Sequence, residues 1–172
     1  MQKFQSDLFN MLEARILELG FDFERADGSG GDSSQLGDTL LFLLPITEDD
    51  DRALTDLRFI QIDDERFCIQ VFLTIFNNLE DGYDELEKAL PALNLYTRFG
   101  SYGMLKAQRQ FWNKYVFAIR ELDLTDGPEG VAVALLDVLD LIREQNTAIY
   151  ETVAALASGS MTYQEAIQSG LI

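Results

Sequence analysis

The sequence predicts an α+β fold in which helices pack on an antiparallel sheet of about five strands, in the order α-β-β-β-α-β-β-α. Three observations lead to this prediction. Apolar residues recur with helical spacing at both ends of the chain, strand-like apolar runs fill the middle, and short polar segments connect them. With 172 residues, of which 47% are hydrophobic, the chain is long enough to bury roughly 70% of the surface that its unfolded form exposes.

Two amphipathic helices frame the chain. The first is predicted over residues 4–19, where apolar side chains share one face and Gly20 follows as a stop signal. The second is predicted over residues 131–157, because Pro128 and Glu129 mark a helix start. Its apolar positions alternate spacings of three and four, as in a heptad seam with one polar member. These positions are Ala132, Leu135, Leu139, Ile142, Asn146, Ile149, Val153 and Leu156.

A short helix follows the long one. Thr162 and Glu165 have the spacing of a capping box, in which each residue satisfies a backbone N–H of the other. We therefore expect a single domain over residues 1–158 and a short helical extension over residues 159–172.

Strand patterns occupy the region after the first helix. A short strand is predicted at residues 21–25, before a loop rich in Gly, Ser and Asp. Residues 39–45 are almost wholly apolar, so we expect that strand to be buried on both faces. Residues 57–62 and 67–76 are separated by the turn sequence DDER, and the apolar character of 67–76 predicts a strand in the middle of the sheet.

A middle helix is predicted to start at about Tyr83. Pro91 should kink or shorten it, since proline lacks the N–H that the helix interior needs. Gly100 ends this element, and strands follow at about residues 102–108 and 114–122.

The net charge of −17, from 30 acidic and 13 basic residues, limits the partners. It opposes binding to nucleic acids and to anionic membranes, so neither is expected as a partner. The longest strongly apolar run, residues 40–46, is far below the roughly 20 residues that cross a bilayer. With no signal-peptide pattern and with Cys68 as the single cysteine, the expected location is the cytoplasm.

Candidate catalytic and metal sites are weak. The chain has no histidine, which removes the commonest general base and transition-metal ligand. Carboxylates cluster at residues 47–51, 63–65 and 80–87, and the segment 27–38 has oxygen side chains at alternate positions. That segment departs from an EF-hand loop, because its sixth residue is Asp where Gly is required and its twelfth is Asp where Glu is required. Solvated loops explain these clusters better than a divalent-ion site does.

Cys68 lies in an apolar strand and has no base, so it is expected to be a buried structural residue. We therefore predict no catalytic residues, no metal site, no cofactor and no enzymatic activity. An enzyme that relies on carboxylates alone stays as an alternative.

Two segments carry a family resemblance, ALPALNLYTRFGSYGML and NKYVFAIRELDL. The first has a leucine–asparagine pair, Leu93 and Asn94, and an aromatic–Gly–Ser junction formed by Phe99, Gly100 and Ser101. With the order of elements and the acidic, histidine-free composition, these segments resemble the type III secretion chaperone-like fold, and within it the YbjN-type domains. The resemblance covers roughly residues 4–157.

This resemblance implies a small acidic protein, often a homodimer, that binds other polypeptides on an exposed sheet and helix surface. It implies regulatory or chaperone-like roles and no established enzymatic activity. The longer Gly/Ser loop and the additional C-terminal helix depart from the secretion chaperones, which argues against a role in secretion itself.

The segment 98–120 contains five basic residues and no acidic one, and its predicted hairpin closes around Phe111 and Trp112. Three interpretations are open. In the first, the Lys and Arg side chains protect a sheet edge from pairing with another strand. In the second, Phe111 and Trp112 form a protruding tip that anchors a partner, and Arg109 and Lys114 orient an acidic part of that partner. In the third, the cations and aromatic rings bind nucleic acid, which the net charge opposes.

The seam of the long helix has two interpretations. It packs on the protein's own sheet, or it meets a second copy of the chain. Asn146 favours the second, because at a symmetric contact it can pair with its own copy. The predicted dimer interface is therefore Asn146, Ile142 and Ile149.

These observations together predict a non-enzymatic, chaperone-like or adaptor protein that forms a homodimer and binds another polypeptide at an exposed sheet edge and at the hairpin tip. The alternative is a regulatory domain that binds a small ligand or a divalent metal ion between sheet and helices.

Overall fold

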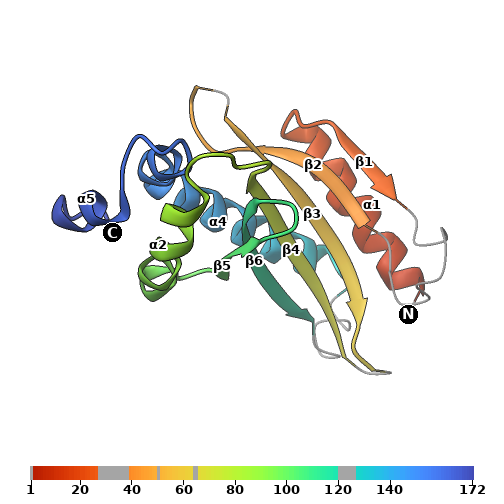
Figure 1. The fold of residues 1–172 in the computed structure, drawn as a ribbon. Coiled ribbons are helices and arrows are strands. Elements are labelled where there is room, and N and C mark those ends of the chain that lie inside the picture. Colours follow the sequence, from red (N-terminus) through yellow and green to blue (C-terminus); the bar gives the residue numbers. More distant parts are fainter. Residues whose placement is uncertain (1, 27–38, 50, 64–65, 120–126) are drawn as a thin grey trace. The chain divides into compact units, whose positions relative to one another are not determined.

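The computed structural model describes residues 2–26, 39–49, 51–63, 66–119 and 127–172 (Figure 1). Four helices and six strands are found in this part of the chain. The helices are α1 (Gln2–Glu18), α2 (Tyr83–Tyr96), α4 (Pro128–Ala157) and α5 (Tyr163–Gln168). The strands are β1 (Phe23–Ala26), β2 (Thr39–Pro45), β3 (Arg52–Gln61), β4 (Phe67–Phe76), β5 (Ser101–Leu105) and β6 (Gln110–Ile119). The α+β class is confirmed, with β1 as a sixth strand.

The strands form one antiparallel sheet in the order β1-β2-β3-β4-β6-β5. β4 lies between β3 and β6, so the prediction that this apolar strand is central is confirmed. β1 and β5 are the two edges. In the β5–β6 pair, Tyr102 faces Asn113 and Gly103 faces Trp112.

Internal contacts divide the chain into two compact units. Unit 1 comprises Met1–Leu44, Leu54–Phe72 and Tyr115–Asp140. Unit 2 comprises Pro45–Ala53, Leu73–Lys114 and Leu141–Ile172. The terminal helix α5 is part of unit 2.

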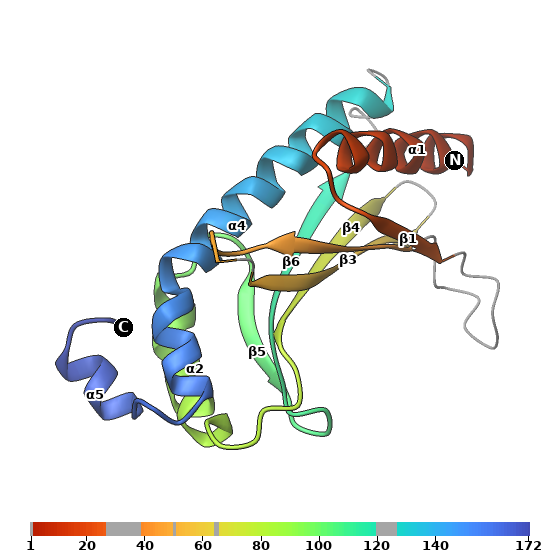
Figure 2. The ribbon, with the colours of Figure 1, turned by 90° about the horizontal axis from the view of Figure 1, so that it is seen from above.

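In unit 1, α1 and the first half of α4 cover one face of the strands (Figure 2). Phe9 of α1 contacts Phe59 of β3 edge to face at 6.5 Å, and Phe59 stacks on Phe67 of β4 at 5.6 Å. The guanidinium of Arg25 lies over the Phe9 ring at 5.6 Å and donates to the Glu13 carboxylate at 2.9 Å. Aromatic packing and one partly buried ion pair therefore attach α1 to the sheet.

Strand β2 differs from its prediction. Leu40, Phe42 and Leu44 are buried, but Leu43 is 46% exposed. The expectation that residues 39–45 are buried on both faces is wrong, because helices of unit 1 cover only the face that carries Phe42.

Unit 2 has its own core, formed by α2, β5, β6 and the second half of α4. Leu86, Phe111 and Leu156 are fully buried in it. Gly82 is the N-cap residue of α2, and its N–H donates to the Ala157 carbonyl at 3.1 Å. A Cβ at this position would lie 1.8 Å from the Leu156 carbonyl oxygen, so only glycine allows this close approach.

α2 continues past Pro91 to Tyr96, so this proline does not end the helix. α4 begins at Pro128 with Glu129 in its first turn, as expected. The capping box of Thr162 and Glu165 at the start of α5 is confirmed. Within the described ranges, no helix combines the length and the apolar character that a membrane span requires.

The β5–β6 hairpin turns at residues 106–109, earlier than predicted. β6 starts at Gln110, so Phe111 and Trp112 lie within the strand. The turn has the sequence KAQR, and Arg109 adopts a φ of 47° in the left-handed region. Since this region normally favours Gly or Asn, the turn had no sequence signal.

Candidate functional site

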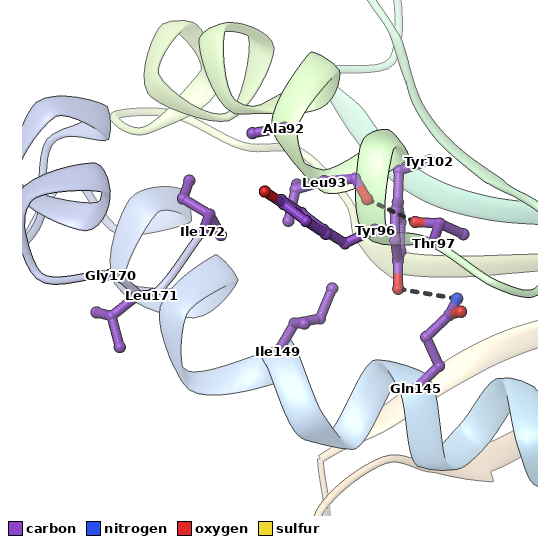
Figure 3. A pocket seen from close by; sticks show the side chains of 10 residues that line it. All are labelled: Ala92, Leu93, Tyr96, Thr97, Tyr102, Gln145, Ile149, Gly170, Leu171 and Ile172. Atoms are coloured by element: carbon purple, nitrogen blue, oxygen red, sulfur yellow. Dashed lines mark hydrogen bonds between the residues drawn. The ribbon is translucent and has the colours of Figure 1, made fainter.

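Unit 2 contains an apolar pocket of about 470 Å³ (Figure 3). It is formed by the C-terminal part of α2, by β5, by the second half of α4 and by the segment after α5. The lining residues are Ala92, Leu93, Tyr96, Thr97, Tyr102, Gln145, Ile149, Gly170, Leu171 and Ile172. None of these is an Asp, Glu, Lys or Arg, and most of the wall is aliphatic or aromatic. A site of this volume and lining is typical of the binding of apolar groups.

Tyr102 joins the pocket wall to the core of unit 2. Its side chain is 4% exposed, and its ring stacks on Phe111 with the ring centroids 5.5 Å apart. Its hydroxyl donates to Asn146 Oδ1 at 3.1 Å. It also accepts from Gln145 Nε2 at 3.4 Å (Figure 3). The phenol is therefore hydrogen-bonded within the chain, and does not require a ligand for that purpose.

Burial raises the pKa of Tyr102 to about 12, and the hydrogen bond from Gln145 lowers it to a lesser degree. The folded protein therefore favours the neutral phenol up to a higher pH than an unfolded chain does. The wall near Tyr102 is uncharged, which suits an uncharged occupant.

Gln145 of α4 fixes the junction between α2 and β5. Its Oε1 accepts from the backbone N–H of Arg98 at 2.8 Å and from that of Phe99 at 3.0 Å. Its Nε2 donates to the Phe99 carbonyl at 3.0 Å. Gly100 follows with a φ of 79°, and a Cβ there would lie 2.2 Å from the Lys114 carbonyl oxygen. These contacts determine where β5 begins and so where Tyr102 lies.

Asn94 of α2 occupies the outer edge of β5. Its Oδ1 accepts from the Tyr102 N–H at 2.7 Å, and its Nδ2 donates to the Tyr102 carbonyl at 2.9 Å. The amide therefore makes the two bonds that a neighbouring strand would make at this residue. The expected peptide-binding sheet edge is closed here, and that expectation is corrected for β5 at Tyr102.

The opening of the pocket carries exposed apolar side chains. Tyr96 is 73% exposed and Leu171 is 47% exposed. Ile149 and Ile172 are partly buried and pack against the core cluster of unit 2. Figure 3 shows both isoleucines directed into the same space as the Tyr96 ring. An apolar interior with an apolar rim is a surface that gains free energy when a second molecule covers it.

The predicted aromatic anchor at the hairpin tip is wrong. Phe111 is 0% exposed, and it contacts Tyr102 and Phe76 in the core. Trp112 lies on the opposite face of β6, where its ring covers Gly103, and a Cβ on that glycine would lie 2.2 Å from the indole. Alternation along the strand separates the two residues, so they cannot form one exposed tip.

The predicted cationic partners of that tip are also placed elsewhere. Arg109 lies in the turn and donates to the carbonyls of Leu79 and Glu80, while its guanidinium lies over the Tyr83 ring at 5.2 Å. Lys114 is half-buried in β6, opposite Ser101. Arg109 therefore attaches the hairpin turn to the start of α2.

The predicted dimer contact on α4 is corrected as well. Asn146 is 1% exposed, accepts from the Tyr102 hydroxyl and donates from Nδ2 to the Ile142 carbonyl at 2.8 Å. Ile142 is fully buried in the chain itself, and Ile149 lines the pocket. The seam in this half of α4 thus packs internally, and Asn146 finds its partner in Tyr102.

Among the described residues, no group of three or more His, Cys, Asp and Glu side chains could hold a metal ion. The predicted acidic segment 27–38 lies outside the described residues. Cys68 is buried, as expected.

Sequence reasoning missed most of the pocket. Tyr96, Gln145 and the segment after α5 were not singled out, and Ile149 was assigned to a different role. One signal was present: Leu171 and Ile172 are apolar residues that follow a helix end, which favours packing back onto the protein.

Searches against family models, curated proteins and solved structures found no match to this chain. The resemblance to the type III secretion chaperone-like fold stays a prediction.

Proposed function

We propose that this protein is a non-enzymatic, chaperone-like or adaptor protein that binds an apolar part of another polypeptide in the pocket of unit 2. The observation that carries the proposal is an apolar concave site of about 470 Å³ with the exposed side chains of Tyr96 and Leu171 at its opening.

The mechanism is burial of apolar side chains. Each leucine-sized side chain that leaves water for this site contributes roughly 1.5–3 kcal/mol before the entropic cost of binding. The hydroxyls of Tyr102 and Thr97 and the amide of Gln145 already have partners within the chain. When a ligand enters and displaces water, these groups therefore keep hydrogen-bond partners.

Two features support a binding role over catalysis. No lining residue has an Asp, Glu, Lys or Arg side chain, and burial raises the pKa of Tyr102 further above neutral pH. The acidic surface keeps complexes with exposed apolar segments in solution. We also propose a cytoplasmic location and a homodimer, and no surface is assigned to the dimer contact.

A second candidate is an uncharged small molecule. The pocket volume falls within the range of about 300–1,000 Å³ that is common for small-molecule sites. This candidate uses the same residues and differs only in the ligand.

The experiment fills the pocket. Ala92→Phe adds a ring to a lining position of α2, whereas Val133→Phe makes a similar enlargement at a position of α4 in unit 1 that is 47% exposed. Binding of fluorescein-labelled peptides with leucines at i and i+4 is measured by anisotropy, beside the same peptides with serine at those positions. The uncharged dye N-phenyl-1-naphthylamine serves as the small-molecule probe.

We expect the leucine peptides to bind the parent protein and the Val133→Phe variant but not the Ala92→Phe variant. Dye binding that Ala92→Phe removes, without peptide binding, would favour the second candidate. Peptide binding that survives Ala92→Phe unchanged would contradict the proposed site.

A further inference from the structure

A second surface lies in unit 1, on the sheet face opposite to α1. Pairing of Arg25 with Leu40 in the β1–β2 ladder, together with the contact of Arg25 with Phe9, places Leu40 on the face that α1 covers. Residues one position away therefore point to the other face. Figure 1 shows the strands in front of α1, and none of the helices described for unit 1 lies on that front face.

We call this surface the open face. Its apolar members belong to the outward positions of β2, β3, β4 and β6 within unit 1. They are Leu41, Leu43, Leu54, Ile60, Phe72 and Val116. Leu43 and Leu54 are each 46% exposed, and Val116 is 49% exposed. Because β2, β3, β4 and β6 are neighbours in the sheet, these side chains lie on adjacent strands and not as isolated positions.

The charges on the open face are nearly balanced. Asp56 and Arg58 lie on it two residues apart in β3 and form an ion pair, with Arg58 Nη2 and Asp56 Oδ2 separated by 2.9 Å. Burial raises the pKa of Asp56, while Arg58 lowers it by charge and by hydrogen bonding. The pair therefore already lies in a poorly solvated position, and covering it would bury no net charge.

Unit 1 as a whole is strongly acidic. Its sequence contains 18 acidic and 6 basic residues, a net charge of −12. Glu24 is one of these acidic residues, and its pairing with Leu41 in the β1–β2 ladder places it beside the open face. A second copy of the chain would bring another unit of the same charge, which repels at close range. A basic surface would instead be attracted and oriented.

We propose that the open face of unit 1 is a docking surface for a basic polypeptide, whose apolar side chains contact Leu43, Leu54 and Val116 while its Lys and Arg residues are attracted by Glu24 and by the net negative charge of unit 1. This inference is independent of the pocket, because the two surfaces belong to different units. The expected partner has an apolar centre and a cationic rim, as in interfaces that combine a dry core with a polar periphery.

The test uses a short amphipathic peptide of leucine and lysine as the probe, and the same peptide with glutamate in place of lysine. Affinity is measured by anisotropy for the parent protein and for Leu54→Asp, Val116→Asp and the control Leu17→Asp. Leu17 lies on α1 in unit 1 and is 56% exposed. Each substitution adds one negative charge, so attraction by charge alone would make every variant bind the basic peptide at least as tightly.

We expect Leu54→Asp and Val116→Asp to weaken binding of the basic peptide about tenfold or more, and Leu17→Asp to leave it unchanged or tighter. The acidic peptide should not bind. Equal or tighter binding by Leu54→Asp would overturn the proposal, and so would equal binding of the acidic peptide.

Hydrogen exchange on the unmodified protein provides a second readout that needs no variant. The basic peptide should slow amide exchange in β2 and β3 of unit 1. Slowing confined to α2 and β5 would assign the peptide to the pocket and overturn the open face as its site. Light scattering tests whether the parent protein is a dimer and whether Leu54→Asp is a monomer. If both are true, the occupant of the open face is a second copy of the chain, which would contradict the basic partner.

Discussion

The two units treat exposed apolar surface in different ways. Unit 2, with 12 acidic and 7 basic residues in its sequence and a net charge of −5, forms a concave site. Three side-chain amides, those of Asn94, Gln145 and Asn146, fix the backbone and the phenol around it. Unit 1, with a net charge of −12, exposes a sheet face that carries the Asp56–Arg58 ion pair.

This difference separates two ways of selecting a partner. A pocket selects by shape, because an occupant must fill it without strain. A flat face selects mainly by charge, because its apolar centre accepts many side chains while its surroundings repel anions. Comparing matched substitutions in the two units tests whether they also differ in stability.

The largest effect is expected from the cores. Phe111→Ala in unit 2 and Phe9→Ala in unit 1 each remove a fully buried ring, which should lower the free energy of unfolding by about 3–5 kcal/mol. Since β4, β6 and α4 contribute residues to both units, we expect cooperative unfolding, so each variant should speed hydrogen exchange in both units. Faster exchange in only the substituted unit would show that the units unfold separately.

A smaller effect is expected at the edge of β5. Asn94→Ala removes both side-chain bonds to the Tyr102 backbone and should cost about 1–3 kcal/mol in urea unfolding. Asn94→Asp keeps the acceptor for the Tyr102 N–H and loses the donor, so its effect should be intermediate. Because Asn94→Ala also exposes the β5 edge, light scattering should detect self-association. If Asn94→Asp costs as much as Asn94→Ala, the acceptor bond contributes little.

The smallest effect concerns alkaline pH. The pKa of Tyr102 is raised to about 12 in the folded protein, above the value of about 10 for an unfolded chain. The folded state therefore keeps a proton that the unfolded state loses, and the stability gained is complete below about pH 10 and is lost as pH rises toward 12. In Tyr102→Phe, the free energy of unfolding should therefore have fallen by about 1 kcal/mol less than in the parent protein at about pH 11.

The matched control for that measurement is Tyr96→Phe, which removes an exposed phenol of the same pocket. Tyr150 adds to the decline, since burial first and then the carboxylate of Asp51 raise its pKa to about 12. A decline of equal slope in the parent protein and in Tyr102→Phe would rule out a contribution from Tyr102.

The sequence predicted those elements whose signals are local. β2 and β4 begin and end where their apolar runs do, and α4 follows its seam, because burial of a continuous apolar stripe defines both. The turn at Arg109 was missed, because a left-handed arginine held by the carbonyls of Leu79 and Glu80 depends on residues distant in sequence.

The open face and the pocket were beyond sequence reasoning for a related reason. The apolar sequence of β2 is compatible with burial of one face or of both faces. Only the position of α1 shows that one face is covered. Likewise the polar residue in the seam, Asn146, predicts a need for a hydrogen-bond partner but not its source. That source is Tyr102, 44 residues away in the chain.

The indole that covers Gly103 gives the protein a built-in spectroscopic probe. Trp112 is the single tryptophan in the sequence, and its ring lies over Gly103, whereas the side chain of Tyr102, the preceding residue of β5, is on the opposite face of the strand. A ligand in the pocket would therefore not contact the indole, but it would change the emission of the indole if β5 shifts. Intrinsic fluorescence of the unlabelled protein would thus report a ligand in the pocket only through a movement of β5, the strand that separates the ligand from the fluorophore.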